Sequence, residues 1–211
     1  MTTIAILGSG RVASSLASGL ARAGHTITIG VRDIAIPRNW TGPDVRFASH
    51  AEAIGSSQIV INATPGAGSV ERLTALADAL AGKLLIDVAN ATSRDEDGAP
   101  SGLLYPTDSL AERLQAALPR TNVVKTLNTM LSSVMNNPAS LTGNPTAYLS
   151  GDNTGAKSLV RSLLHDLGWQ DSEILDLGGI ATARGVEAVM LLVTDVMKAT
   201  GFAPFAISPV R

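Results

Sequence analysis

The ten residues Ile4-Ala5-Ile6-Leu7-Gly8-Ser9-Gly10-Arg11-Val12-Ala13 set the architecture expected for this chain of 211 residues. The first four form an apolar run typical of a buried parallel strand. The pattern G-x-G-x-x-A follows. In it Gly8 permits a tight turn, Gly10 lets a phosphate approach the backbone, and Ala13 lets a helix pack close to the strand. The N-terminus of that helix offers free N–H groups to an anion. The stretch therefore predicts a dinucleotide-binding turn.

The residues after this turn strengthen the interpretation. An amphipathic segment runs from residue 12 to residue 23, Gly24 suits its C-terminal cap, and Thr26-Ile27-Thr28-Ile29 alternates like a strand. Strand, turn, helix and strand are the context in which a G-x-G-x-x-A motif has its functional meaning. A purely structural glycine turn stays open as the alternative.

Composition excludes several classes of protein. Lys and Arg number 16 against 18 Asp and Glu, so the net charge is -2, which disfavours nucleic acid and anionic membrane surfaces as partners. The chain has no cysteine and only three histidines, in separate predicted elements, so we expect no metal site. Met1-Thr2-Thr3 carries no basic leader and no apolar run reaches membrane-spanning length. A cytoplasmic protein with a small-molecule partner is the expectation.

Strands and helices alternate along the rest of the chain, which predicts a Rossmann-type doubly wound parallel sheet in the α/β class. We expect one NADP-binding domain over residues 1–211, with a nucleotide-binding core at 1–130 and a small C-terminal αβ extension at 131–211. The extension should continue the same sheet, without a separate helical domain. Residues 91–106 are expected to form the longest loop. Further strands are predicted at 45–47, 58–63, 84–88, 122–126, 146–150 and 173–177, and helices at 49–55, 69–80, 109–118, 132–136, 155–167 and 180–200.

The end of the second strand bears on the choice between NAD and NADP. An NAD site places an acidic residue there for the ribose hydroxyls, whereas an NADP site needs positive charge for the 2′-phosphate. Arg32 follows the strand and can pair with a phosphate, Arg38 is a possible second contact, and Arg11 adds charge near the pyrophosphate. These arginines favour NADP. The alternative, in which Arg32 is a solvated surface residue and Asp33 binds the NAD ribose, stays open.

The carboxyl ends of the other predicted strands should frame the reacting rings, because ligands of open parallel sheets bind there. Asn90 and Asn128 offer amide groups suited to a carboxamide or a planar heterocycle, although each also suits a turn cap. Lys125 is the only strongly basic residue near the strand ends that should frame the rings. It is a candidate general acid for carbonyl or imine reduction, and a structural role for it is the alternative. A direct hydride transfer between two rings requires none of these acid–base groups, so we predict no catalytic side chain.

Several motifs together resemble one known family. They are Gly8-Ser9-Gly10, Gly30-Val31-Arg32-Asp33, Asn62-Ala63-Thr64-Pro65, Val124-Lys125-Thr126-Leu127-Asn128-Thr129, Gly168-Trp169 and Asp176-Leu177-Gly178. This combination is similar to the NADPH-dependent reductases of the deazaflavin coenzyme F420, nearly from end to end. Val31 departs from the Ser or Thr that often precedes the arginine in that family, which removes one hydroxyl contact to the 2′-phosphate. The dinucleotide-binding part of membrane ferric reductases has a similar lysine-to-threonine pattern, so the acceptor is less well specified than the cofactor.

The resemblance, added to the strand ends, implies an NADP-dependent oxidoreductase that transfers a hydride directly between NADP(H) and a deazaflavin (coenzyme F420) or flavin. Alternatives are a small carbonyl, imine or ferric reductase and a non-catalytic NADP sensor. The apolar helix at 180–200 and the 202–205 tail favour a homodimer. Expected acceptor contacts are Pro65, Asn128 and Thr129. Expected cofactor contacts are Gly8, Ser9, Gly10, Arg11, Val12, Val31, Arg32, Arg38, Ala63, Thr64, Pro65 and Asn90.

Overall fold

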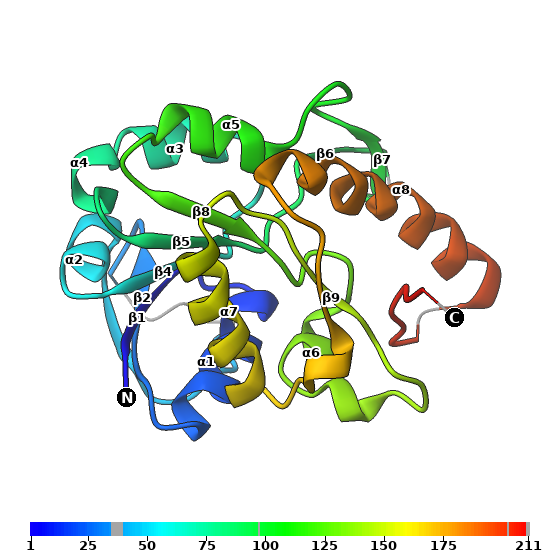
Figure 1. The fold of residues 1–211 in the computed structure, drawn as a ribbon, viewed down its shortest axis with the longest axis horizontal. Coiled ribbons are helices and arrows are strands. Elements are labelled where there is room, and N and C mark those ends of the chain that lie inside the picture. Colours follow the sequence, from blue (N-terminus) through cyan, green and yellow to red (C-terminus); the bar gives the residue numbers. More distant parts are fainter. Residues whose placement is uncertain (35–39, 97, 202, 210–211) are drawn as a thin grey trace.

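The computed structural model of the chain describes residues 1–34, 40–96, 98–201 and 203–209. Its central sheet contains six parallel strands in the spatial order β3-β2-β1-β4-β5-β8 (Figure 1). This order confirms the predicted Rossmann-type sheet. Successive strands are added on one side of β1 up to β3 and on its other side from β4 onward, and ligands of such sheets bind at this switch point between β1 and β4. The strands are β1 (Thr3–Leu7), β2 (Thr26–Val31), β3 (Arg46–Ser49), β4 (Ile59–Asn62), β5 (Leu84–Asp87) and β8 (Asn122–Lys125).

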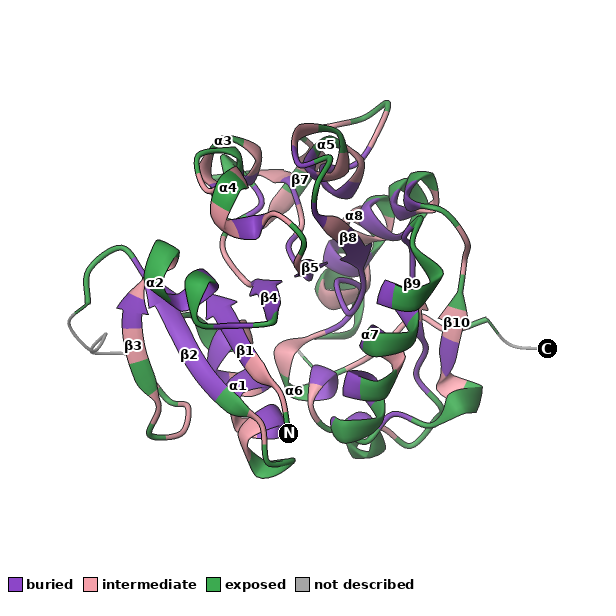
Figure 2. Cartoon of the chain, turned by 60° about the vertical axis from the view of Figure 1, so that its left-hand side comes forward, coloured by how far each residue is buried: buried purple, intermediate pink, exposed green. Residues whose placement is uncertain are grey.

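Both faces of this sheet are covered by helices, because alternate strand residues are apolar on both sides. Ile4 and Ile6 of β1 pack toward α1 (Arg11–Arg22) and α7 (Thr154–Asp166). Ala5 and Leu7 pack toward the opposite layer. Apart from the edge strand β3, the strands of the sheet are buried along most of their length (Figure 2). The opposite layer contains α2 (His50–Gly55), α3 (Ser69–Thr74), α4 (Ala77–Leu80) and α5 (Leu110–Ala117).

Local signals placed most of these helices correctly. The expected capping box at α2 is present: Glu52 N–H donates to Ser49 Oγ at 3.3 Å, and Ser49 N–H donates to the Glu52 carboxylate at 3.0 Å. Gly24, with a φ of 88°, follows the end of α1 as expected. The single helix expected over residues 69–80 is wrong, because the chain breaks at Leu76, whose φ and ψ of -113° and 17° are not helical.

The expected structureless loop at 91–106 is also wrong. An antiparallel hairpin lies there, formed by β6 (Thr92–Arg94) and β7 (Pro100–Leu103). Its turn is closed by Asp95, whose backbone N–H donates to Ala99 O at 2.9 Å and whose carboxylate accepts the Ala99 N–H at 2.8 Å. The short strands were not predicted, because the charged and glycine residues of this stretch are typical of loops.

The C-terminal part does not continue the main sheet, contrary to expectation. β9 (Ala147–Leu149) and β10 (Ile174–Asp176) form a separate two-stranded parallel sheet. It meets β8 through one antiparallel bridge, in which Lys125 and Ser150 exchange backbone hydrogen bonds of 2.9 and 3.1 Å. This bridge joins one residue pair only, and Ser150 lies just beyond β9, so β9 and β10 form a ladder of their own. The division of the chain at residue 130 remains a prediction.

One long helix, α8 (Ala183–Thr200), follows a 3-10 turn at Ile180–Thr182 and packs against β7. The C-terminal segment turns back beside it (Figure 1), and Tyr148 Oη donates to Ile207 O at 2.9 Å. Among the described residues, no helix combines the length and the apolar character needed to cross a membrane. The remaining short elements are α6 (Ser132–Met135) and the 3-10 turns Pro138–Ser140 and Asp171–Glu173.

Candidate functional site

The glycine turn after β1 has the backbone geometry that its sequence predicts. Gly8 has a φ of 106°, and a Cβ added to it would lie 2.8 Å from Ala63 O, so a side chain is excluded there. A Cβ on Gly10 would meet no atom within 4 Å. Gly10 caps α1 with no side-chain hydrogen bond, which leaves N–H groups of the first turn available to an anion. The space beside Gly10 is therefore open to a ligand.

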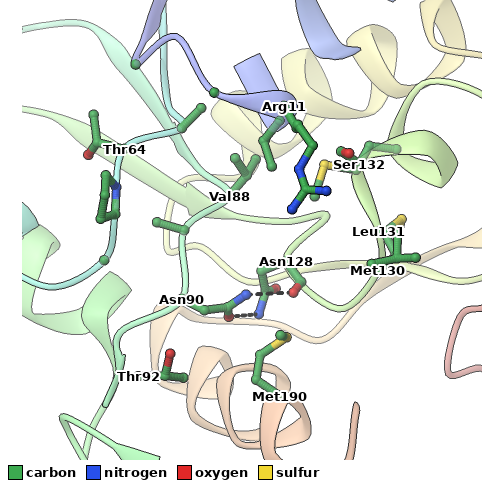
Figure 3. Close-up of a pocket in the computed structure, with 18 of the residues that line it drawn as sticks. Arg11, Thr64, Val88, Asn90, Thr92, Asn128, Met130, Leu131, Ser132 and Met190 are labelled. Atoms are coloured by element: carbon green, nitrogen blue, oxygen red, sulfur yellow. Dashed lines mark hydrogen bonds between the residues drawn. The ribbon is translucent and has the colours of Figure 1, made fainter. Parts of the chain in front are cut away.

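A cavity of about 760 Å³ begins at this turn and follows the carboxyl ends of β1, β4, β5 and β8 (Figure 3). Its size is in the range of ordinary ligand pockets. We refer to Gly8–Val12 as the turn side of the cavity and to Asn90, Thr92, Arg94, Asn128 and Met190 as its hairpin side. Ten predicted site residues line the cavity: Gly8, Ser9, Gly10, Arg11, Val12, Ala63, Thr64, Pro65, Asn90 and Asn128.

The other predicted residues lie elsewhere. Val31 is buried in β2, Thr129 is buried next to the lining, and Arg32 is exposed beyond the end of β2. Arg38 lies outside the described residues. Arg32 therefore lies on the open surface and Val31 in the core, and neither lines the cavity.

The end of β2 forms a cationic corner. His50 is the first residue of α2, directly after the end of β3. Its burial has the largest effect in lowering its pKa, and the nearby charges of Arg72 and Arg32 lower it further. His50 is therefore neutral at pH 7, and the two arginines supply the positive charge.

The two asparagines predicted at the strand ends form a hydrogen-bonded pair on the hairpin side (Figure 3). Asn90 Nδ2 donates to Asn128 O at 2.8 Å, and Asn128 Nδ2 donates to Asn90 Oδ1 at 2.9 Å and to Val186 O at 2.9 Å. Leu127 has a φ of 58°, a conformation rare for a residue with a side chain, and it turns the chain immediately before Asn128. The shared hydrogen bonds hold both amides at the cavity edge.

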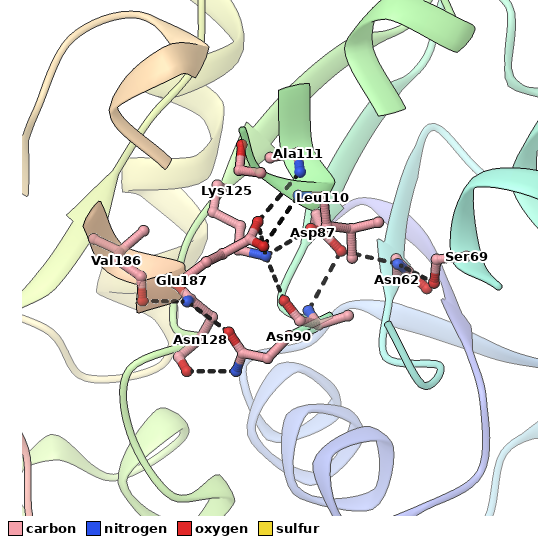
Figure 4. Close-up of polar contacts among 12 residues, drawn as sticks. Asn62, Ser69, Asp87, Asn90, Leu110, Ala111, Lys125, Asn128, Val186 and Glu187 are labelled. Atoms are coloured by element: carbon pink, nitrogen blue, oxygen red, sulfur yellow. Dashed lines mark hydrogen bonds and ion pairs between the residues drawn. The ribbon is translucent and has the colours of Figure 1, made fainter. Parts of the chain in front are cut away.

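A buried ionic cluster lies beneath the asparagine pair (Figure 4). The Nζ of Lys125 lies 2.8 Å from Asp87 Oδ2 and 3.0 Å from Glu187 Oε1, and it also donates to Ala89 O. Burial works to lower the pKa of Lys125, but the two carboxylates outweigh it and raise that pKa. Lys125 is fully buried and is not among the cavity-lining residues, so it is not in position to protonate a ligand.

Glu187 connects this cluster to two helices. Its carboxylate accepts the backbone N–H groups of Leu110 and Ala111, at 3.0 and 3.2 Å, and so caps α5 from α8. Val186, the residue before it, accepts a hydrogen bond from Asn128. The cluster therefore joins β5, β8, α5 and α8 behind the asparagine pair.

The loop after β4 is held equally firmly. Asn62 Nδ2 donates to Asp87 Oδ1 at 2.8 Å, and its Oδ1 accepts the Thr64 hydroxyl at 2.6 Å. Arg72 Nη2 donates to Pro65 O at 2.7 Å. A Cβ on Gly66 would overlap the backbone of Asn90, so this glycine allows the two loops to touch. The loop is therefore positioned before any ligand arrives.

Sequence reasoning missed about half of the cavity. Met130, Leu131 and Ser132 directly follow the predicted strand end, so their position was available from the chain order. No local pattern pointed to the hairpin or to α8, because both reach the cavity through long-range packing. Gly66 and Ala89 belong to the strand ends that were expected to frame the rings. The lining residues missed are Ala67, Val88, Thr92, Arg94, Pro100, Met130, Leu131, Ser132, Ser133, Met135, Met190 and Pro204.

Charged groups are few in this cavity. Of the described residues that line it, only Arg11 and Arg94 carry a charge, and none is Asp, Glu, His, Lys or Tyr. Over the described part of the chain, no group of three or more His, Asp or Glu residues is arranged to hold a metal ion. The cavity can bind anionic and flat apolar groups, but its lining offers no general acid or base.

Residues 3–91 match the sequence profile of a family described as "NADP oxidoreductase coenzyme F420-dependent". A crystal structure of a candidate F420-dependent NADP-reductase from Arthrobacter sp. FB24 is 38% identical to this chain, covers 100% of both chains and superposes with a TM-score of 0.92.

Curated relatives are similar over most of this chain. Metalloreductase STEAP3 of Rattus norvegicus is 33% identical over 190 residues, which are 89% of this chain and 36% of that protein. Metalloreductase STEAP2 of Homo sapiens is 28% identical over 192 residues, which are 90% of this chain and 36% of that protein. The chain thus spans about a third of the length of these relatives.

Proposed function

Since the chain belongs to the family of coenzyme F420-dependent NADP oxidoreductases, we propose that it transfers a hydride directly between NADP(H) and the ring of a deazaflavin, such as coenzyme F420, or of a flavin. NADPH supplies the hydride from its nicotinamide ring when bound. The acceptor gains that hydride with its electron pair and takes one proton from water. The role of the protein is to bind and orient both rings.

The observation that carries this proposal is the absence of acid–base groups among the described residues that line the cavity. Reduction of a carbonyl or an imine is helped by a proton donor within hydrogen-bond reach of the reacting atom. Transfer between two aromatic rings depends on proximity and orientation instead. The lining supports the second type of reaction.

The turn side suits NADP(H). Gly8 and Gly10 leave the backbone open to a pyrophosphate, and Arg11 adds a positive charge at the start of α1. Arg32, exposed after β2 beside the cationic corner, is the proposed contact of the 2′-phosphate. We propose the same role for Arg38 on sequence grounds alone.

The asparagine pair and its apolar neighbours suit the two rings. Asn128 Oδ1 accepts no hydrogen bond from the described residues, so it is available to an amide N–H of a ligand. Val88, Met130 and Met190 offer apolar and polarisable surface around it. We propose that the nicotinamide and the acceptor ring lie between these groups, with Pro65 and Thr129 at or near the acceptor.

A second candidate is the NADPH-oxidising part of a ferric reductase. It is favoured by one observation, the similarity to two proteins named metalloreductase. A carbonyl or imine reductase that uses Lys125 is disfavoured, because both carboxylates and a carbonyl enclose its Nζ. A non-catalytic NADP sensor would bind NADPH without oxidising it.

The experiment that separates these functions is NADPH oxidation, followed at 340 nm, with a panel of acceptors. Coenzyme F420, flavin mononucleotide (FMN), a ferric chelate without flavin and a cyclic imine represent the four classes. We expect turnover with the deazaflavin or the flavin and none with the imine. Turnover with the ferric chelate alone would favour the second candidate, and tight NADPH binding without any turnover would favour the sensor.

We further propose that two copies associate through α8. Leu192 is 51% exposed there, and Val196, four residues later on the same side of the helix, is half-buried. An apolar helix face of this kind is typical of an association surface. Sedimentation equilibrium should show a dimer, and Leu192→Glu should shift it toward monomer. A wild-type monomer at all concentrations would contradict the proposal.

A further inference from the structure

The hairpin aims one cationic side chain at the cavity. Thr92 and Arg94 lie two residues apart on β6, whose pairing with β7 is irregular between Ser93 and Arg94. Both line the cavity, whereas Ser93 between them meets Ser101 on the other side, with 3.2 Å between the hydroxyl oxygens. We infer that Arg94 binds an anionic substituent, a phosphate or a carboxylate, that the hydride acceptor carries outside its ring. This inference rests on the proposed function and adds to it a chemical requirement on the acceptor.

The charge inventory of the cavity supports this role. Arg11 and Arg94 are the only charged side chains among the described lining residues, and both are cations. The phosphates of NADP(H) have their proposed partners in the glycine turn, Arg11 and Arg32. Arg94 is therefore a cation for which the cofactor offers no further phosphate.

The two cations belong to different walls of the cavity. Arg11 begins α1 on the turn side, and Arg94 ends β6 on the hairpin side. Figure 3 shows Arg11 at one end and Thr92 and Met190 at the other, with the asparagine pair between them. If the two rings stack near the asparagine pair, a side group of the acceptor can extend toward the hairpin.

Arg94 is oriented but not neutralised by its surroundings. Its Nη1 donates to Gly98 O within the hairpin, and no described carboxylate lies within ion-pair distance of it. The adjacent Asp95 carboxylate accepts the Ala99 N–H and closes the hairpin turn. A guanidinium group has five N–H donors, so most of those of Arg94 remain available to an anion.

Three flavins with the same ring test the inference. Riboflavin carries a neutral side chain, 10-carboxymethylflavin carries a carboxylate, and FMN carries a phosphate. We expect kcat/KM to be about tenfold higher for an anionic flavin than for riboflavin, because a hydrogen bond between two charged groups favours binding and solvent exposure weakens it. Whether the carboxylate or the phosphate is preferred identifies the anion.

The variant Arg94→Gln should remove this preference. Its kcat/KM for the anionic flavin should fall to the value for riboflavin through a higher KM, while turnover of riboflavin and the KM for NADPH stay unchanged. Arg94→Lys should keep part of the preference. Arg120→Gln is the matched control, because Arg120 is exposed and pairs with Asp78 away from the cavity.

Binding titrations make the test independent of turnover. Flavin fluorescence in the presence of NADP⁺ gives a Kd for each of the three flavins with the wild type and with Arg94→Gln. Equal Kd values for the neutral and anionic flavins in the wild type would overturn the inference, and so would weaker NADPH binding in the variant. A lack of turnover with every acceptor, with the anion preference in Kd intact, would instead overturn the proposed function alone.

Discussion

The two sides of the cavity are built in different ways. The turn side is one continuous stretch of five residues, and its shape depends on the backbone of two glycines. The hairpin side is assembled from residues far apart in sequence: Asn90 and Asn128 are 38 residues apart, and Asn128 and Val186 are 58 apart. A local motif can place a cofactor, whereas the position of an acceptor depends on the fold as a whole. The following predictions test this difference, beginning with the largest expected effect.

The hairpin side should depend on the ionic cluster beneath it. Lys125→Met leaves Asp87 and Glu187 buried without their cation, and the free energy of unfolding should fall by about 3–5 kcal/mol. Urea denaturation measures this change. The control is the triple variant Lys125→Met, Asp87→Asn and Glu187→Gln, which should recover part of the loss. A loss below about 1 kcal/mol for the single variant would mean that the cluster is not structural.

The stabilisation that the same cluster gives to the folded state should be lost only in strong alkali. The folded state raises the pKa of Lys125 above the unfolded value of about 10.4. Its stabilising effect is therefore fully present below that pH and is lost as the pH rises through the folded value.

Substitution of the two glycines of the turn should have different effects, on stability at Gly8 and on NADPH binding at Gly10. Gly8→Ala forces a side chain into a positive φ and against Ala63, so the free energy of unfolding should fall by about 1–3 kcal/mol. Gly10→Ala meets no atom and should change stability by about 1 kcal/mol or less. It should nevertheless weaken NADPH binding about tenfold or more by blocking the pyrophosphate. Unchanged NADPH affinity in Gly10→Ala would remove the turn from the cofactor site.

The choice between NADP and NAD should depend on Arg32. Arg32→Ala should raise the Kd for NADPH about tenfold, as expected for the loss of a partly exposed charged hydrogen bond, and leave the Kd for NADH unchanged. Asp33→Asn is the paired variant. If Asp33→Asn weakens NADH binding while Arg32→Ala has no effect on NADPH, the site is an NAD site. Isothermal titration measures both constants.

The smallest expected effect is at His50. Burial and the adjacent arginines lower its pKa in the folded state, so the unfolded chain binds more protons as the pH falls through about 6.5. This group therefore reduces stability toward acid. His50→Gln should flatten the dependence of the unfolding free energy on pH between about 7 and 5.5. An unchanged slope would show that His50 does not contribute to it.

Features that depend on nearby residues could be predicted from the sequence, whereas features that depend on distant residues could not. The glycine turn and the capping box at Ser49 depend on neighbours within a few residues, and each was predicted correctly. The parallel Rossmann-type sheet was predicted from the alternation of strands and helices along the chain. The hairpin at 92–103 and the separate β9–β10 sheet were missed, because short strands with weak alternation are defined by their pairing partners. Lys125 shows the limit most clearly. Its strand was predicted. Its burial between Asp87 and Glu187 was not, because Glu187 belongs to α8 and lies far from Lys125 in the sequence.

Some expectations remain predictions. They include the domain division at residue 130, the cytoplasmic location, the homodimer and the individual roles of the site residues. Of the residues missed, Arg94 matters most, because it separates acceptors by charge.

The most direct test of a hydride transfer between stacked rings is an isotope experiment. NADPH carrying deuterium on the transferred C4 position is oxidised by the protein with coenzyme F420 in ordinary water, and the reduced deazaflavin is analysed by mass spectrometry. The deazaflavin has a carbon in place of the flavin N5, so a hydride received there does not exchange with solvent. We predict one deuterium in the reduced deazaflavin. A product without deuterium, formed at a rate dependent on NADPH, would contradict direct transfer.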